Sequence, residues 1–256
     1  MTSPRPLLSL PLGIFLSAAS LLSAADPKPI GKPVTWTTPD GVRLAGLFHP
    51  PDRPQRYVWI LLHGLGSNKQ EWLDFARRLA ERGDGFLIYD ARGHGESVHR
   101  AHGGAIDYRE FRTLGVGSEW DGMADDLRSA VGFLASRFSL DVRRIAVGGA
   151  SLGANVALVY AGRRPEVPAL LLLSPGLQYA GVEIEEAFRR YGKRPLFMAA
   201  SPADAYAYES VRRLAAQRND SNCVVAEGEG AAHGVHMLNE AFTWKLLEWM
   251  KELESH

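Results

Sequence analysis

The stretch Gly149–Gly153, with the sequence GASLG, decides the fold of this chain. It follows the largely apolar run Arg144–Gly148 and precedes the helix-like run Ala154–Tyr160. A serine between two glycines, placed between a strand and a helix, is the pattern of a nucleophile elbow. The turn is too tight for bulky neighbours. The helix that follows offers a backbone N–H and the positive end of its dipole to a developing oxyanion. We therefore predict that Ser151 is a nucleophile.

Strand-like and helix-like segments alternate on both sides of this motif. Continuous apolar runs are typical of parallel strands that are buried on both faces, and apolar residues at helical spacing indicate amphipathic helices. The alternation predicts an α/β fold, with a single mostly parallel sheet and helices on both faces. The predicted strands are 34–37, 42–48, 57–62, 86–89, 145–148, 169–173, 196–200 and 223–226, and the predicted helices are 71–82, 119–138, 154–160, 206–218 and 237–253.

The composition limits the function classes. The chain has 256 residues, with 29 basic and 29 acidic side chains, and contains no basic block, so we expect no nucleic-acid partner. Its one cysteine, Cys223, cannot form an intrachain disulfide. The length of residues 26–256 suits one large α/β domain as well as two small ones, and we expect one domain.

The N-terminus resembles a secretory signal peptide. Arg5 precedes the uncharged, leucine-rich stretch 7–24, and Ser23–Ala25 supplies the small residues that a signal peptidase needs. We expect residues 1–25 to be removed, which leaves a secreted or periplasmic protein without a stable membrane span. The alternative is an uncleaved anchor, since the stretch approaches the length of a span of about 17–25 residues.

A serine hydroxyl needs a general base, usually histidine, which a carboxylate orients. His233 directly follows the last predicted strand, among small residues that allow one ring to approach Ser151. We predict that His233 is the base. His236 is the rival, although its position suits the start of the final helix.

The predicted acid is Asp204, the only carboxylate directly after the strand 196–200. Asp220 follows a helix, and Glu227 and Glu229 stand just before the histidine loop. Choosing Asp204 gives the chain order serine, aspartate, histidine, which is the order expected for nucleophile-elbow hydrolases.

Two further motifs complete a resemblance to the α/β-hydrolase superfamily over nearly all of residues 34–253. Residues 63–66, HGLG, resemble its oxyanion motif, and residues 90–97, DARGHGES, resemble its D-x-R-G-H-G-x-S turn. The resemblance implies an oxyanion hole formed by the backbone N–H groups of Leu65 and Leu152. It also implies that His63 holds the oxyanion loop, that Asp90 and Arg92 brace their turn, and that His94 is not the base.

The segment 174–194 bears on the substrate. Many members of the superfamily insert a lid domain at this place, whereas here about twenty residues fill the gap. They include one short helix candidate, 183–190, so we expect little or no cap and an open site. The loop 98–118, with Tyr108 and Phe111, is either one wall of the site or a solvated crossover.

These features predict a serine hydrolase that cleaves small-molecule carboxylic esters of short to medium acyl chains through Ser151, His233 and Asp204. It would form an acyl-enzyme and need no metal or organic cofactor. The same triad would serve a thioesterase or a small serine peptidase. A non-catalytic binding protein on a hydrolase scaffold is an alternative of another class. The sequence identifies neither the substrate-binding residues nor the oligomeric state.

Overall fold

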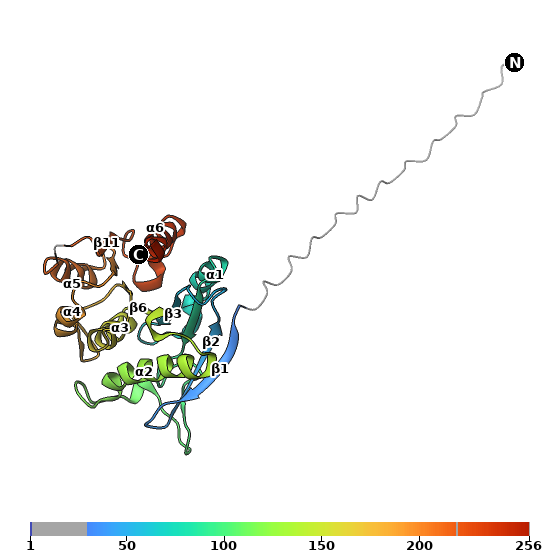
Figure 1. Cartoon of the computed structure of the whole chain (residues 1–256), viewed down its shortest axis with the longest axis vertical. Helices are drawn as coiled ribbons and strands as arrows, with labels where there is room; N and C mark the ends of the chain where they lie inside the picture. Colours follow the sequence, from blue (N-terminus) through green and yellow to red (C-terminus); the bar gives the residue numbers. More distant parts are fainter. Residues whose placement is uncertain (2–29, 219, 256) are drawn as a thin grey trace.

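The computed structural model describes Met1 and residues 30–218 and 220–255 (Figure 1). The predicted signal peptide, apart from Met1, lies outside the described residues. Within these residues, no helix has both the length and the apolar character needed to cross a bilayer.

One sheet forms the centre of the domain, and it is mostly parallel, as predicted. Its strand order is β1-β2-β4-β3-β6-β7-β10-β11, with the short β5 paired to β2. β1 pairs antiparallel with β2, and β2 pairs antiparallel with β4, whereas every pair from β4 to β11 is parallel. The strands are β1 Lys32–Thr37, β2 Val42–His49, β3 Val58–Leu62, β4 Gly85–Tyr89, β5 His99–Arg100, β6 Ile145–Ala150, β7 Leu170–Leu173, β10 Leu196–Ala200 and β11 Cys223–Glu227.

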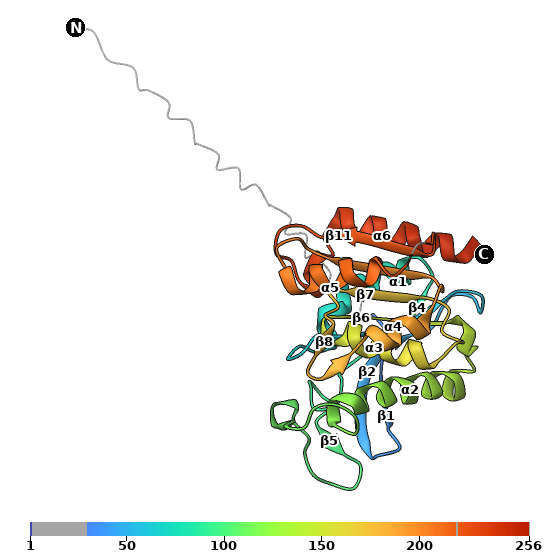
Figure 2. The ribbon, with the colours of Figure 1, turned by 90° about the vertical axis from the view of Figure 1, so that its left-hand side faces the viewer.

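Helices cover both faces of the sheet, which confirms the predicted layers (Figures 1 and 2). The apolar strands are buried on both sides because successive side chains point to opposite faces. In β3, Ile60 packs with α2 and α3, while Trp59 packs on the other face with α1 and α6. The helices are α1 Leu73–Glu81, α2 Glu119–Phe138, α3 Leu152–Arg163, α4 Glu185–Tyr191, α5 Ala205–Ala215 and α6 Glu240–Glu252.

Two predicted helix starts were wrong, because a 3₁₀ turn occupies each of the two positions. A 3₁₀ turn, Lys69–Trp72, precedes α1, and the Asn68 side chain caps this turn by accepting from Gln70 N. A second 3₁₀ turn occupies Gly234–Met237, where the last helix was expected to begin. The side chain of Asn239 accepts from Phe242 N and so starts α6 at Glu240.

The segment between β7 and β10 contains no multi-helix cap, as expected. It forms a small hairpin, β8 Gln178–Tyr179 and β9 Val182–Glu183, followed by α4. The hairpin was not predicted, because strands of two residues are too short to carry a periodic pattern.

Candidate active site

Ser151 stands on a strained turn between the end of β6 and the start of α3. Its backbone has φ 55° and ψ −122°, a conformation that is costly for a residue with a side chain. The flanking glycines allow the turn. A Cβ on Gly149 would lie 2.3 Å from the carbonyl carbon of Gly153, and a Cβ on Gly153 would lie 2.4 Å from Leu62 O. Any larger residue at either position would therefore push the helix away from the sheet.

Asp204 and His233 form a close pair at the ends of two neighbouring strands. Asp204 follows β10 and His233 follows β11, and these strands are parallel partners. The Nδ1 of His233 lies 2.6 Å from Oδ2 of Asp204. With its Nδ1 hydrogen donated to the carboxylate, the imidazole keeps Nε2 free to accept a proton. The side chain of His233 remains 41% exposed, so a substrate can reach it.

Several contacts fix the loop of His233 beside the turn that carries Ser151. Gly234 N donates to Ser174 Oγ at 2.9 Å, and Ser201 Oγ donates to Ala232 O at 2.7 Å. Gly234 has a φ of 58°, and a Cβ there would lie 3.1 Å from the Cβ of Ala150, the residue before the elbow serine. The loop that carries His233 thus packs directly on the turn of Ser151. His236 lies in the following 3₁₀ turn, away from Asp204's hydrogen bond.

The loop after β3 passes close to Ser151 from another direction. A Cβ on Gly64 would lie 3.4 Å from the Cβ of Ser151. The next residue, Leu65, is half exposed, and Leu152 begins α3, where the first N–H groups of a helix have no partner within the helix. Two backbone donors in these positions suit an oxyanion formed on a carbonyl that Ser151 attacks.

Two buried histidines hold this loop from below. His63 donates from Nδ1 to Gly64 O at 2.8 Å and accepts at Nε2 from Ala91 N at 2.9 Å. His94 donates from Nδ1 to Arg92 O and accepts at Nε2 from Gly66 N at 3.3 Å. Burial lowers the pKa of His63 to about 4 and also lowers the pKa of His94. Both rings are therefore neutral at pH 7, and their nitrogens are engaged by the backbone.

Glu71 is a residue of this site that sequence reasoning missed. Its Oε1 accepts from Gly64 N at 3.0 Å, so a partly buried carboxylate holds the amide next to Leu65. Burial raises the pKa of Glu71. The sequence placed this residue at a helix start, and nothing in the helical pattern indicates that the side chain turns back to the preceding loop.

The loop 98–118 borders the site, which favours the first of its two interpretations. Tyr108 stacks on His94, with ring centroids 4.0 Å apart and an interplanar angle of 10°. Its hydroxyl lies 3.3 Å from the position that a Cβ of Gly66 would take. This loop therefore supports the oxyanion loop from its solvent side.

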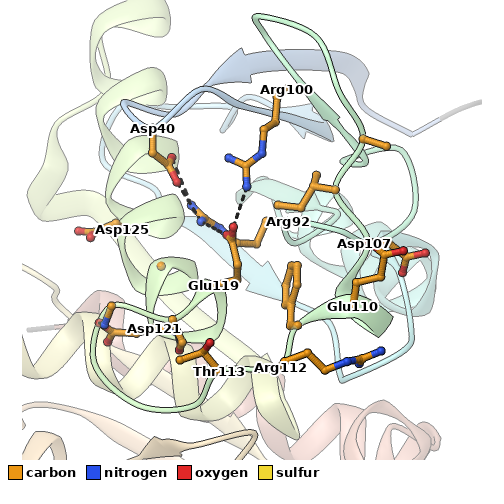
Figure 3. A pocket seen from close by; sticks show the side chains of 16 residues that line it. Asp40, Arg92, Arg100, Asp107, Glu110, Arg112, Thr113, Glu119, Asp121 and Asp125 are labelled. Carbon is orange, nitrogen blue, oxygen red and sulfur yellow. Dashed lines mark hydrogen bonds and ion pairs between the residues drawn. The ribbon is translucent and has the colours of Figure 1, made fainter.

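Arg92 braces a different region. It is buried and ion-paired with Asp126, Asp40 and Glu119, and Glu119 also pairs with Arg100. Asp40, Arg92, Arg100 and Glu119 line part of a pocket of about 620 Å³ between the loop 105–119 and the start of α2 (Figure 3). Among the described residues that line it, none is Ser151, Asp204 or His233. Across residues 30–218 and 220–255, no three His, Cys, Asp or Glu side chains are grouped to hold a metal ion.

Comparison with known proteins places this chain in a family. The model of the family described as "Serine aminopeptidase, S33" matches residues 53–200. An uncharacterized protein of Mycobacterium tuberculosis is 32% identical over 169 residues, which cover 66% of this chain and 54% of that protein. The chain spans about half the length of the curated relatives it matches.

Solved structures show the same fold at low identity. The esterase Pf2001 of Pyrococcus furiosus superimposes with a TM-score of 0.67 and 21% identity, covering 86% of this chain and 90% of that one. The α/β hydrolase GrgF of a Penicillium species gives a TM-score of 0.66 and 17% identity, covering 88% and 99%. These likenesses confirm the predicted α/β-hydrolase fold.

Proposed function

The chain belongs to the hydrolase family described as serine aminopeptidase, S33, and we propose that it is a serine hydrolase that cleaves carboxylic esters of short to medium acyl chains. The observation that carries the proposal is the Asp204–His233 pair packed against the strained turn of Ser151. If the histidine–aspartate pair had only a structural role, nothing would require a serine in a strained conformation, with φ 55°, beside it.

The reaction has two halves. Ser151 Oγ attacks the ester carbonyl while His233 Nε2 takes its proton, and the N–H groups of Leu65 and Leu152 bind the oxyanion. When the tetrahedral intermediate collapses, the bond from carbon to the alcohol oxygen breaks and His233 returns the proton to that oxygen. Water then attacks the acyl-enzyme by the same steps in reverse. Asp204 orients the imidazole and stabilises its charged form.

A small serine peptidase and a thioesterase remain the second candidates, because the same triad performs both reactions and the family description names an aminopeptidase. An activity panel separates the candidates. We expect the purified protein to cleave p-nitrophenyl esters of short acids, and to cleave aminoacyl anilides far more slowly.

Ser151→Ala is the control for this panel. Removing a triad nucleophile costs several orders of magnitude, so a variant within about tenfold of the wild type would exclude Ser151 as the nucleophile. A faster reaction with the anilides than with the esters would replace the esterase assignment by the peptidase.

For location, we propose export with removal of residues 1–25, on the strength of the leader pattern. The mass of the mature protein after expression of the full chain tests this. A mature chain that keeps Met1 and partitions with membranes would favour the anchor.

A further inference from the structure

Hydrogen bonds from α3 and α5 anchor the β8–β9 hairpin beside the site. From below, the buried side chain of Asn155 donates to Gly176 O at 2.8 Å and to Val182 O at 2.9 Å, and accepts from Gly176 N at 3.2 Å. From the side, the hydroxyl of Tyr206 donates to Gln178 O and accepts from Gln178 N, both at 3.0 Å. Five hydrogen bonds thus tie the hairpin to α3 and α5.

This anchoring determines where Tyr179 lies. Its ring meets Tyr206 edge to face at 5.6 Å and His233 edge to face at 6.4 Å. Gly176 leaves room for both rings because it has no side chain. A Cβ there would lie 2.6 Å from Cζ of Tyr179 and 2.6 Å from Cε1 of Tyr206. The phenol is therefore held next to the candidate base.

The hydroxyl of Tyr179 is a hydrogen-bond donor rather than a base. Burial raises the pKa of Tyr179, the charge of Asp204 raises it further, and the Ser151 side chain acts in the opposite direction. The net shift is upward, so the phenol keeps its proton at any pH used for assay. The ring of Tyr179 lies beside His233, the candidate base.

We propose that Tyr179 donates a hydrogen bond to the leaving-group oxygen of the substrate and thereby makes this site selective for oxygen esters. The inference rests on the proposed function. In the free enzyme the phenol ring lies edge to face with His233, with ring centroids 6.4 Å apart. After attack, Ser151 Oγ is bonded to the acyl carbon, and the leaving-group oxygen is attached to that same carbon. Leu65 and Leu152 occupy the oxyanion side, whereas Tyr179 stands on the side of His233, which must protonate the leaving group.

The step needs no additional reactant. The bond from the acyl carbon to the leaving oxygen breaks, its electron pair goes to that oxygen, and His233 supplies the proton. Tyr179 stabilises the negative charge that develops there and keeps its own proton. The leaving oxygen accepts this hydrogen bond most strongly when negative charge develops on it. The sulfur of a thioester is a weak acceptor, so thioesters gain less.

Tyr179→Phe removes only the hydroxyl and tests the inference with two butyrate esters. Nitrophenolate leaves readily without a donor, whereas the ethoxide of ethyl butyrate needs one. We measure kcat/KM, because it reports the acylation half in which the leaving group departs. We expect a fall of at least about 10-fold for ethyl butyrate and of less than about 3-fold for p-nitrophenyl butyrate, since a hydrogen bond to a charged group is worth about that factor or more.

Tyr208→Phe is the matched control. Tyr208 lies on α5 and its hydroxyl donates to Glu227 on the surface, so neither substrate should be affected. If Tyr179→Phe lowers both esters by the same factor, Tyr179 only packs the wall and the inference is overturned. If Ser151→Ala retains ester cleavage, the proposed function itself fails. The two failures are therefore distinguishable.

Discussion

Replacing Glu71 should perturb the proposed oxyanion loop without changing a residue of the proposed triad. The Glu71 carboxylate accepts from Gly64 N at 3.0 Å, and Gly64 lies against Ser151. Any displacement of this amide also moves the adjoining N–H of Leu65, a proposed oxyanion donor. We therefore expect the substitution to slow the reaction by weakening the stabilisation of the transition state.

The size of the effect follows from the lost contact. Glu71→Ala leaves the Gly64 N–H without this acceptor, which costs about 1–3 kcal/mol, or about 5- to 150-fold in kcat/KM if it is felt fully in the transition state. Glu71→Gln keeps an acceptor oxygen and loses only the charge. Charge-assisted hydrogen bonds are about twice as strong as neutral ones, so we expect a loss of about 2- to 10-fold.

Although Glu71→Gln should lower activity, we expect it to leave the stability of the fold unchanged or to increase it. Burial is the largest influence on Glu71 and raises its pKa, although Ser67, the Gly64 amide and the charges of His236 and His233 act to lower it. A carboxyl whose pKa rises on folding destabilises the fold when it is ionised, and this cost is absent at pH values below its unfolded pKa. Glu71→Gln removes the cost, so we expect a Tm at pH 7 equal to or above that of the wild type.

The assay combines kcat/KM for p-nitrophenyl butyrate with thermal unfolding at pH 7. Asp74→Asn is the control, because Asp74 lies three residues further along and its side chain is fully exposed. It should change neither quantity. The reasoning is refuted if Glu71→Ala stays within about twofold of the wild type, since an unsatisfied amide costs more than that. A Glu71→Gln variant that loses Tm and activity together would make Glu71 a purely structural residue.

The remaining predictions concern the triad, the acyl chain and pH. His233→Ala should be nearly as damaging as removal of the nucleophile, because the two act as a unit, and His236→Ala should keep most activity. If His236→Ala is the inactive variant, the base is misassigned. Asp204→Asn should lower kcat by about two to four orders of magnitude with little change in KM, since it favours the wrong tautomer, and a near-silent variant would exclude Asp204 as the acid. Because the segment 174–194 builds no multi-helix cap, kcat/KM should peak at acyl chains of about two to six carbons. Each methylene adds about 0.8 kcal/mol of binding free energy only if the protein buries it. An optimum at about twelve carbons, or a rate jump at an oil–water interface, would contradict this. The pKa of His63 falls from 6.5 to about 4 on folding, so stability is complete above about pH 6.5 and falls by about 3 kcal/mol as the pH drops to 4. The free energy of unfolding of His63→Asn, measured with urea, should lack this part of the pH dependence. An unchanged pH dependence would show that other groups cause the loss of stability at low pH.

The sequence by itself determined the mostly parallel sheet, its layers and the turn that carries Ser151, the proposed nucleophile. These features are local. The elbow depends on glycines whose Cβ atoms would collide with Gly153 and Leu62. The buried strands depend on continuous apolar runs of about four to six residues. The choice of Asp204 and His233 depended on their positions after two strands, and the structure sets them 2.6 Å apart.

Only the tertiary structure decided which side chains support the loops around the site. Glu71 binds Gly64, Asn155 binds Gly176, and Tyr206 binds Gln178, across 7, 21 and 28 residues of chain. In each case the partner is a backbone N–H or C=O, which nearly every residue type possesses. A side chain that bonds to the backbone therefore leaves no complementary residue type in the sequence. The hairpin with Tyr179 and the true starts of the helices became visible only once the chain was folded.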